Sequence, residues 1–449
     1  MTGGNANPQD ELVTIDVWLA YYPFPGHEDG IEELAEEFGR AHPGHRVNIR
    51  FVNYWTLPAK VAKAVEEGNP PTVAEYYYTN AQQARDAKDK DGTPLYTSVG
   101  EAIGGRTEIL GVPVVIDDIV AAARDYYSYD GTLFAMPRNT STALMFANTT
   151  LLEAAGVTEL PRTWDEFETA CAAVAELPGT THPSTWPVHG WLFQQAIAQQ
   201  GGLLADHDNG RSGRAEKVDL ASDELIAYVN WWRRLHEKGY YTYTGKEADW
   251  LGAAKAFATG QVAFTFASSH ESAAMVRAGR AGGFQVKAGS LPHNGRVPNA
   301  GAIIGGDAAF LAAGLDKATE DGALAFLQYM INPANAASYH KTGNWIPITN
   351  SAVDRLDEEG WFTENPHMRA ATNQLHATTN TPASRGALLG DFAGIQHVMD
   401  EAMIDVLVSG ADPVARFTRA TTDAQALLDD YTVNYLDSDT LDPRYVKVF

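Results

Sequence analysis

Two hydrophobic periods alternate along the first eighty residues of the chain. Apolar residues at every second position predict strands, and apolar residues three to four positions apart predict helices. The predicted order is strand 12–19, helix 30–41, strand 47–52, helix 57–67 and strand 72–77. Such an order predicts a parallel sheet with helices on both faces, and small ligands usually bind in the crevice at the strand ends of such a sheet.

A second unit is predicted to begin after residues 138–142. Strands and helices alternate again there, and Thr163 is expected to cap a helix whose first turn is acidic. The elements predicted in this part are strand 144–148, helix 151–155, helix 253–257, strand 260–267, crossover strand 301–306 and mostly helices from residue 316 onward. The sequence therefore predicts at least two α/β units.

Composition and charge narrow the class of protein. The 449 residues include 57 Asp and Glu against 33 Lys and Arg, which gives a formal net charge of −24. At roughly 150 residues per domain, the length allows about two or three compact units. A charge this negative repels phosphate backbones and anionic membrane surfaces. We therefore expect a folded, globular protein without a nucleic-acid partner.

Cys171 is the single cysteine, so disulfide frameworks and Cys-based metal sites are excluded. We expect it to be a small buried residue. No run approaches the roughly 20 apolar residues that span a bilayer. Residues 1–11 are polar and are expected to form a flexible leader, with any export signal or lipidated Cys absent from this sequence.

A secreted hydrolase is the obvious alternative class, and it would be expected to carry a catalytic or metal-binding motif. The sequence has no Gly-x-Ser-x-Gly elbow, no His-Glu-x-x-His, no phosphate loop and no dinucleotide fingerprint. Residues 206–210 resemble a calcium loop, but the ligand spacing is wrong, which favours a surface turn. His270 and Glu271 are most simply a polar loop at the mouth of a cleft. We expect no catalytic residue, no metal and no cofactor.

Aromatic residues gather where predicted strands and loops end. Sugars and other polyols have apolar C–H faces and a rim of hydroxyl groups, so a protein that binds them places aromatic rings on the faces and polar groups at the rim. The aromatic residues in question are Tyr54, Trp55, Tyr76, Tyr77, Tyr78, Trp186, Trp191 and Trp345. Together they make a cleft for a polyol a plausible interpretation.

Four ordered segments carry a resemblance to a known family. The chain resembles the extracellular solute-binding proteins of ABC importers, in the carbohydrate-binding group, with the nearest likeness to glycerol-3-phosphate and glycerophosphodiester binders. The segments are Ala302–Gly306, Phe326–Ala337, Lys341–Thr349 and Gly360–Pro366. The resemblance extends over nearly all of residues 13–431.

The resemblance implies a fold with two α/β lobes, each a mostly parallel sheet flanked by helices, that are joined by hinges and close on a ligand. The N-terminal lobe is expected to comprise residues 12–141 and 302–346, and the C-terminal lobe residues 142–301 and 347–435. Hinges are expected near residues 140–142, 300–304 and 346–349. The resemblance further implies a monomer outside the cytoplasm, in the periplasm or lipid-anchored, that delivers its ligand to a membrane permease.

Ligand contacts can be carried over position by position. The resemblance assigns contacts to Tyr54, Ser141, Trp191, Ser268 or Ser269, Gly306 and Trp345. The acidic residue that grips glycerol hydroxyls in the relatives falls at Tyr78, and their arginine falls at Leu388. Without that guanidinium the group best suited to hold a phosphate is missing, although Arg385 or Arg138 are possible replacements.

Asp307 and Asp391, next to Gly306 and Gly390, are also expected near the cleft, where carboxylates suit hydroxyl or amino groups. The resulting hypothesis is an importer protein that captures a neutral or amino sugar, from monosaccharide to oligosaccharide. The alternatives are a glycerophosphodiester or glycerol 3-phosphate as ligand, a secreted hydrolase, and an adhesin or sensory protein.

Overall fold

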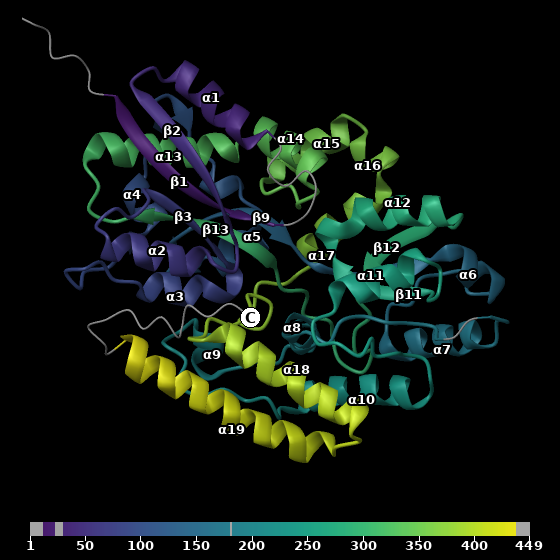
Figure 1. Ribbon diagram of the computed structural model, residues 1–449. Helices are drawn as coiled ribbons and strands as arrows, with labels where there is room; N and C mark the ends of the chain where they lie inside the picture. The colour runs from purple at the N-terminus through teal and green to yellow at the C-terminus, as the bar shows by residue number, and fades with distance from the viewer. Residues whose placement is uncertain (1–11, 23–29, 180–181, 437–449) are drawn as a thin grey trace, which may run out of the picture.

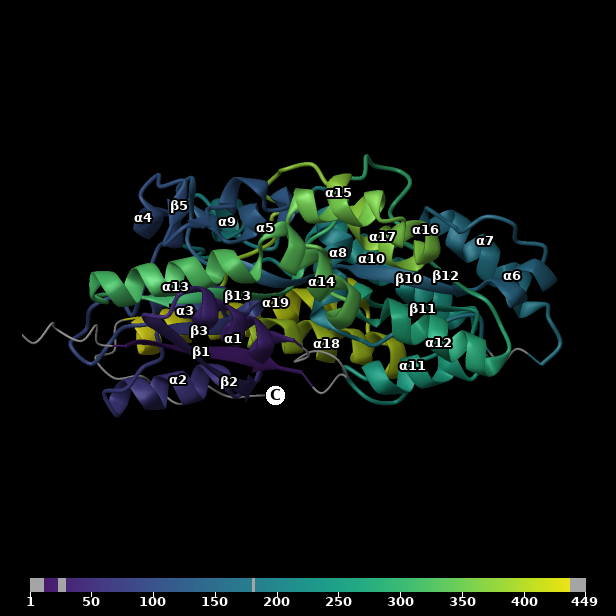
Figure 2. The same cartoon turned by 90° about the horizontal axis from the view of Figure 1, so that it is seen from above.

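The computed structural model describes residues 12–22, 30–179 and 182–436. The expected leader at residues 1–11 lies outside the described residues. The described chain builds one larger and one smaller β-sheet, which lie at opposite ends of an elongated molecule (Figures 1 and 2). Helices pack around each sheet.

The larger sheet has the strand order β2-β1-β3-β13-β4, with β9 paired to β13. Its strands are β1 (Val13–Tyr21), β2 (His45–Asn53), β3 (Val73–Tyr77), β4 (Tyr96–Thr97), β9 (Met136–Ser141) and β13 (Gly305–Ala312). β1 runs parallel to β2 and to β3, with Val17 opposite both Ile49 and Val73. This part is the β-α-β-α-β unit that the sequence predicts.

The smaller sheet has the order β11-β10-β12. Its strands are β10 (Ala143–Asn148), β11 (Phe264–Ser268) and β12 (Val286–Ser290). Two short hairpins, β5 (Glu108–Ile109) with β6 (Val112–Pro113) and β7 (Ser128–Tyr129) with β8 (Thr132–Leu133), lie outside both sheets.

The expectation that both sheets are mostly parallel needs correction. β13 runs antiparallel to β3, β4 and β9, and β10 runs antiparallel to both of its neighbours. The reason is that β10 and β13 each enter their sheet from the other end of the molecule. A strand that arrives by such a crossing runs opposite to the strands that end there.

Helices cover both faces of the larger sheet, with α1 and α13 on one side and α2 on the other (Figures 1 and 2). The helices up to β10 are α1 (Ile31–Ala41), α2 (Leu57–Glu66), α3 (Ala81–Asp86), α4 (Val99–Ile103) and α5 (Ala121–Tyr126). Those between β10 and β13 are α6 (Thr149–Ala154), α7 (Trp164–Ala175), α8 (Gly190–Gln199), α9 (Asp206–Gly210), α10 (Asp223–Glu237), α11 (Trp250–Ala258) and α12 (Ser272–Gly282).

The chain after β13 is almost wholly helical, as predicted. The helices there are α13 (Lys317–Met330), α14 (Pro333–Gly343), α15 (Asn350–Glu358), α16 (Trp361–Glu364), α17 (Pro366–His376), α18 (Phe392–Val408) and α19 (Pro413–Tyr431). α17 packs against β12, whereas α18 packs against α8 and α19.

Local sequence signals explain several of these elements. Thr163 caps α7 in a capping box with Glu166, which accepts the Thr163 N–H in return. Cys171 on this helix is fully buried, as expected. Every residue of β9, β10 and β13 is buried, because these strands run through the centre of the molecule where helices cover both faces.

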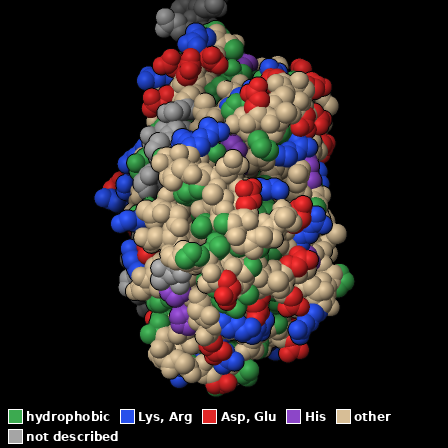
Figure 3. All heavy atoms as spheres, turned by 90° about the vertical axis from the view of Figure 1, so that its right-hand side faces the viewer, with side chains coloured by type: hydrophobic (Ala, Val, Ile, Leu, Met, Phe, Trp, Pro, Cys, Tyr) green, Lys and Arg blue, Asp and Glu red, His purple; other side chains and the backbone are tan. Residues whose placement is uncertain are grey.

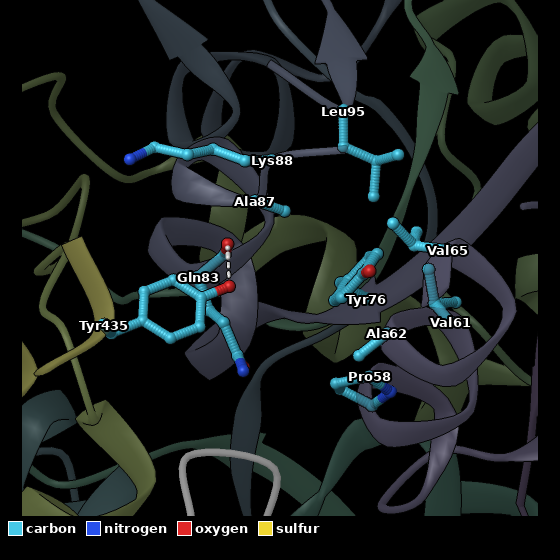
Figure 4. Close-up of a pocket in the computed structure, with 10 residues that line it drawn as sticks. All are labelled: Pro58, Val61, Ala62, Val65, Tyr76, Gln83, Ala87, Lys88, Leu95 and Tyr435. Atoms are coloured by element: carbon cyan, nitrogen blue, oxygen red, sulfur yellow. Dashed lines mark hydrogen bonds between the residues drawn. The ribbon is translucent and has the colours of Figure 1, made fainter. Parts of the chain in front are cut away.

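The C-terminal helices tie the two ends of the molecule together. The Tyr431 hydroxyl donates to Asp86 on α3 at 3.0 Å, and Arg214 also binds Asp86. The Tyr435 hydroxyl donates to the Gln83 carbonyl beside a small apolar pocket (Figure 4). α19, which packs against α10 and α18, thus ends against α3 beside the larger sheet.

The surface in Figure 3, which faces right in Figure 1, mixes acidic and basic side chains without a basic patch. Among the described helices, none is long and apolar enough to cross a membrane.

Candidate functional site

The candidate site lies where the chain crosses between the two sheets. β9 ends at Ser141, Thr142 follows, and β10 begins at once, while β13 returns with Gly305 opposite Ser141. The Thr142 hydroxyl donates to the Ile303 carbonyl at 3.0 Å, and the Thr142 N–H donates to the Ser269 hydroxyl at 3.2 Å. The crossing therefore brings Ser141 and Ser269 together.

Trp191 is packed directly against this crossing. Its indole N–H donates to the Ile304 carbonyl at 3.1 Å. A side-chain carbon placed on Gly305 would lie 2.9 Å from the Trp191 ring and 3.1 Å from the Ser141 hydroxyl. The preceding His189 caps α8 by accepting the Trp191 N–H on Nδ1. Trp191, Ser141 and Gly305 are thus packed together, and all three are buried.

An aromatic cluster forms the other side of the site. Tyr22 and Tyr54 are stacked with ring centroids 4.3 Å apart, and the Trp345 ring lies 5.5 Å from Tyr22. The His270 ring, which follows Ser269, lies 4.4 Å from Trp345. The cluster therefore spans from the ends of β1 and β2 to the segment after β11, and it includes two of the predicted residues, Tyr54 and Trp345.

Asp307 on β13 binds Tyr22 of this cluster and is fully buried. Both of its carboxylate oxygens lie 2.6 Å from the Tyr22 hydroxyl, and the Asn139 amide donates to it at 3.0 Å. Burial, and secondly the neighbouring Glu75, raise the pKa of Asp307 to about 7. Its oxygens are thus held by Tyr22 and Asn139.

Arg138 lies in the same buried network and is only 3% exposed. It binds both oxygens of Glu75, at 2.5 and 3.0 Å, and donates to the Tyr339 hydroxyl at 2.9 Å. Its charge is therefore neutralised by Glu75, so Arg138 does not offer a free guanidinium to a phosphate.

Tyr78 links the larger sheet to α18. Its ring is buried, and its hydroxyl accepts a hydrogen bond from the Gln396 amide at 2.7 Å. The Tyr126 hydroxyl donates to the Tyr78 carbonyl and to the Ala387 carbonyl. Tyr78 thus lies at the contact between the two halves of the molecule.

The remaining predicted residues are held mainly by local contacts. The Ser268 hydroxyl caps the turn Ser269–Glu271 by accepting the His270 N–H. Gly306 has a backbone φ of 109°, and Asp391, at a φ of 44°, caps α18 by accepting the Gly394 N–H. Arg385 is half-buried, and its backbone carbonyl accepts a hydrogen bond from the Arg211 guanidinium. The Nε of Arg385 is buried and has no hydrogen-bond partner among the residues that the structure describes.

Tyr22 and Asn139 lie at the candidate site, although the sequence does not predict them as ligand contacts. Tyr22 stands directly after the first strand, where a ligand crevice is expected, but the aromatic run there was not assigned. Asn139 directly precedes the predicted hinge at residues 140–142, and His270 follows the predicted serines, in the loop that the sequence places at the mouth of a cleft. In contrast, Trp186 is a core residue, because it is fully buried and stacked on Phe266 at 4.2 Å.

Among the described residues, Asp206, His207 and Glu216 are close enough to share a metal ion. His207, Asp208 and Asn209 adopt left-handed backbone conformations. Asn209 explains this turn, because its side chain accepts from Leu204 and Ala205 N–H groups and donates to the Pro382 carbonyl. These hydrogen bonds of Asn209 account for the conformation of the turn without a metal ion.

The fold and the site define a binding protein with two lobes and a polar, aromatic-lined crossing between them. Residues 33–370 match the bacterial extracellular solute-binding protein family, and the chain belongs to this family. It is thereby the solute-binding component of an ABC importer.

Individual relatives agree with this assignment. The chain is 26% identical over 435 residues to the sn-glycerol-3-phosphate-binding periplasmic protein UgpB of Escherichia coli K12, covering 95% of this chain and 94% of that protein. Its fold is similar to UgpB of Mycobacterium tuberculosis in complex with glycerophosphocholine, with a TM-score of 0.73, 24% identity and coverage of 93% and 98%.

It is also similar in fold to the cyclic α-maltosyl-1,6-maltose binding protein of Arthrobacter globiformis, with a TM-score of 0.74, 18% identity and coverage of 93% and 99%. The expected two-lobe periplasmic-binding-protein fold is therefore confirmed.

Proposed function

We propose that this protein captures a carbohydrate, a neutral or amino sugar, between its two lobes and delivers it to a membrane permease. The observation that carries the proposal is the set of residues brought together where the chain crosses between the two sheets. There Trp191, Ser141 and Ser269 meet, and Tyr54 and Trp345 stand in one aromatic cluster with Tyr22. Aromatic faces beside hydroxyl and amide groups suit the two kinds of surface that a sugar presents.

The charges at the site favour a sugar over a phosphate. The position of the relatives' arginine is held by Leu388, which is buried and donates its N–H to the Asn209 carbonyl. Arg138 is neutralised by Glu75. Asp307 brings negative charge or a neutral carboxyl group rather than a cation. A phosphate would therefore find no free bidentate guanidinium at these two positions.

A glycerophosphodiester remains the second candidate ligand. The similarity to the sn-glycerol-3-phosphate-binding protein of Escherichia coli and to the glycerophosphocholine complex of the Mycobacterium tuberculosis protein favours it. Arg385 is the residue that would hold the phosphate in this case, since its Nε is buried and no described residue hydrogen-bonds to it.

We further propose the division into lobes at residues 12–141 with 302–346 and 142–301 with 347–435. The larger sheet draws its strands from the first set and the smaller sheet from the second. Ligand contacts are proposed for Tyr54, Tyr78, Ser141, Trp191, Ser268, Ser269, Gly306, Asp307, Trp345, Arg385 and Asp391. In this account the protein acts as a monomer outside the cytoplasm, lipid-anchored or periplasmic, and releases its ligand unchanged.

A thermal-shift screen of the purified chain tests the proposal. A ligand that binds only the folded state raises the melting temperature with its excess over the dissociation constant. The panel comprises neutral and amino mono- and disaccharides, glycerol 3-phosphate and glycerophosphocholine. Stabilisation by a sugar supports the proposal, and stabilisation by a glycerophosphodiester alone reverses the ranking. Turnover of a chromogenic glycoside or ester would contradict it.

A further inference from the structure

A second tryptophan, outside the proposed contacts, stands beside Trp191. The half-buried Trp250 ring lies 6.3 Å from the Trp191 ring and 5.2 Å from the His189 ring. The preceding loop is fastened to the same place, because the Ala248 N–H donates to the Val188 carbonyl at 3.1 Å. Ala248 has a left-handed φ of 47°, and its carbonyl accepts the Trp250 N–H. The strained turn thus fixes Trp250 next to the start of α8.

A buried carboxylate occupies the same corner. Asp400 on α18 is 3% exposed, and its Oδ1 has no hydrogen-bond partner among the described residues. The backbone of Gly190, the residue before Trp191, hydrogen-bonds to this carboxylate. Gln396, one helical turn earlier, holds the Tyr78 hydroxyl of the other lobe. Asp400 therefore lies at the first residue of α8, directly before Trp191, and one helical turn after the residue that contacts the other lobe.

The charges that act on Asp400 come from Glu247 and Glu401, which are both acidic. Tyr243 and Tyr78 also lie within its electrostatic reach. Burial, and secondly Glu247, raise the pKa of Asp400 well above its usual range. His397 is bound to Glu247 at 2.5 Å, and burial lowers the pKa of His189 to about 4, so His189 adds no charge at neutral pH. With no cation beside it among the described residues, Asp400 is thus held towards its protonated form, and a cation bound there would favour the carboxylate.

We propose that this corner is a subsite for a positively charged nitrogen of the ligand, held between the carboxylate of Asp400 and the rings of Trp191 and Trp250. The inference rests on the proposed function and adds a specificity to it. Aromatic faces attract cations, most strongly when the cation is desolvated, and a nearby carboxylate supplies the counter-charge. The ammonium of an amino sugar and the trimethylammonium of a choline ester share this chemistry.

Two matched pairs of ligands test the subsite by titration calorimetry. One pair is glucosamine and glucose, and the other is glycerophosphocholine and glycerophosphoglycerol, so that each pair differs in the cationic nitrogen. In the pair that binds, we expect the cationic member to bind about tenfold more tightly. Equal binding of both members would overturn the inference while leaving the proposed function intact.

Three variants separate this role from a structural one. Asp400→Asn keeps the shape of the side chain, and we expect it to abolish the preference while the affinity for the neutral member stays unchanged. Trp250→Leu should reduce the preference as well. Asp423→Asn removes a charge from the exposed face of α19 and should keep the full preference.

Two other outcomes would count against the subsite. Equal weakening of both members by Asp400→Asn would mean that Asp400 only supports the fold, and a lost preference in Asp423→Asn would mean that the overall charge of the protein causes it. Absence of binding by all four compounds and by the wider panel would contradict the proposed function itself, and the inference with it.

Discussion

The Tyr22 hydroxyl lies 2.6 Å from both carboxylate oxygens of Asp307, 285 positions later in the chain. This contact joins the end of β1 to the start of β13. It also fixes the ring on which Tyr54 stacks. Because Asp307 is fully buried, the orientation of the aromatic cluster depends on a bond that solvent does not reach.

Tyr22→Phe removes this bond but keeps the ring. A buried acceptor that loses its donor costs about 1 to 3 kcal/mol, so we expect a loss of that order in the free energy of unfolding, measured by urea denaturation. Tyr21→Phe is the matched control, because the neighbouring Tyr21 ring is 37% exposed. An effect of the same size in both variants would contradict the role assigned to Tyr22.

Stability should fall as the pH rises towards 8, in part because of Asp307. Its pKa is raised from 3.8 to about 7 in the folded chain, so the folded state keeps a proton that the unfolded state has lost. The stabilisation is present below about pH 4 and is lost as the pH rises through about 7.

Urea denaturation at pH 5 and pH 8 measures this contribution. We expect the free energy of unfolding to fall between these values by on the order of 2 kcal/mol more in the wild type than in Asp307→Asn. Comparison of the two proteins removes the contribution of Glu271, whose pKa is also raised to about 7 by burial. Identical pH profiles would show that Asp307 does not titrate in this range.

Gly306 should not tolerate a side chain. It has a φ of 109°, and an added Cβ would lie 1.8 Å from the Asn139 carbonyl oxygen. We expect Gly306→Ala to cost about 3 kcal/mol or more. Gly314 also has a positive φ, of 71°, but no atom of the described residues lies within 4 Å of its added Cβ. Gly314→Ala should therefore cost only roughly 1 to 2 kcal/mol, and similar losses in both would refute the close approach of the two strands.

Trp191→Ala should weaken binding of the ligand that the screen finds by on the order of 1 to 3 kcal/mol, because it removes a large stacking face. Trp191→Phe keeps a ring but loses the hydrogen bond to the Ile304 carbonyl, so its loss should be smaller. Trp18→Ala is the control, since Trp18 lies within β1 under the Arg50 guanidinium. Calorimetry would disprove this placement of the site if Trp191→Ala bound with unchanged affinity.

Periodicity alone predicted much of the fold. β1, α1, β2, α2 and β3 begin and end within about two residues of their predicted bounds, because each buries one face against a neighbour close in sequence. Strand direction in the rest could not be predicted in this way. β10 and β13 are buried on both faces, so their residue pattern does not reveal from which end they enter the sheet.

The site was predicted less completely, because its contacts join residues that are far apart in the sequence. Trp191, Ser141 and Trp345 could be placed from their resemblance to family positions. Asp307 was assigned to the cleft from its position in the chain, but its partner Tyr22 is 285 residues away and carries no motif. Arg138 was considered for phosphate binding, whereas its neutralisation by Glu75 is visible only once β3 and β9 are folded together.

The central claim is that ligand is captured between two lobes. Small-angle X-ray scattering of the purified chain, before and after saturation with the ligand identified by thermal shift, tests it most directly. Closure on a ligand shifts the population towards the compact state. We expect a smaller radius of gyration with ligand than without it. Identical curves with and without saturating ligand would contradict it.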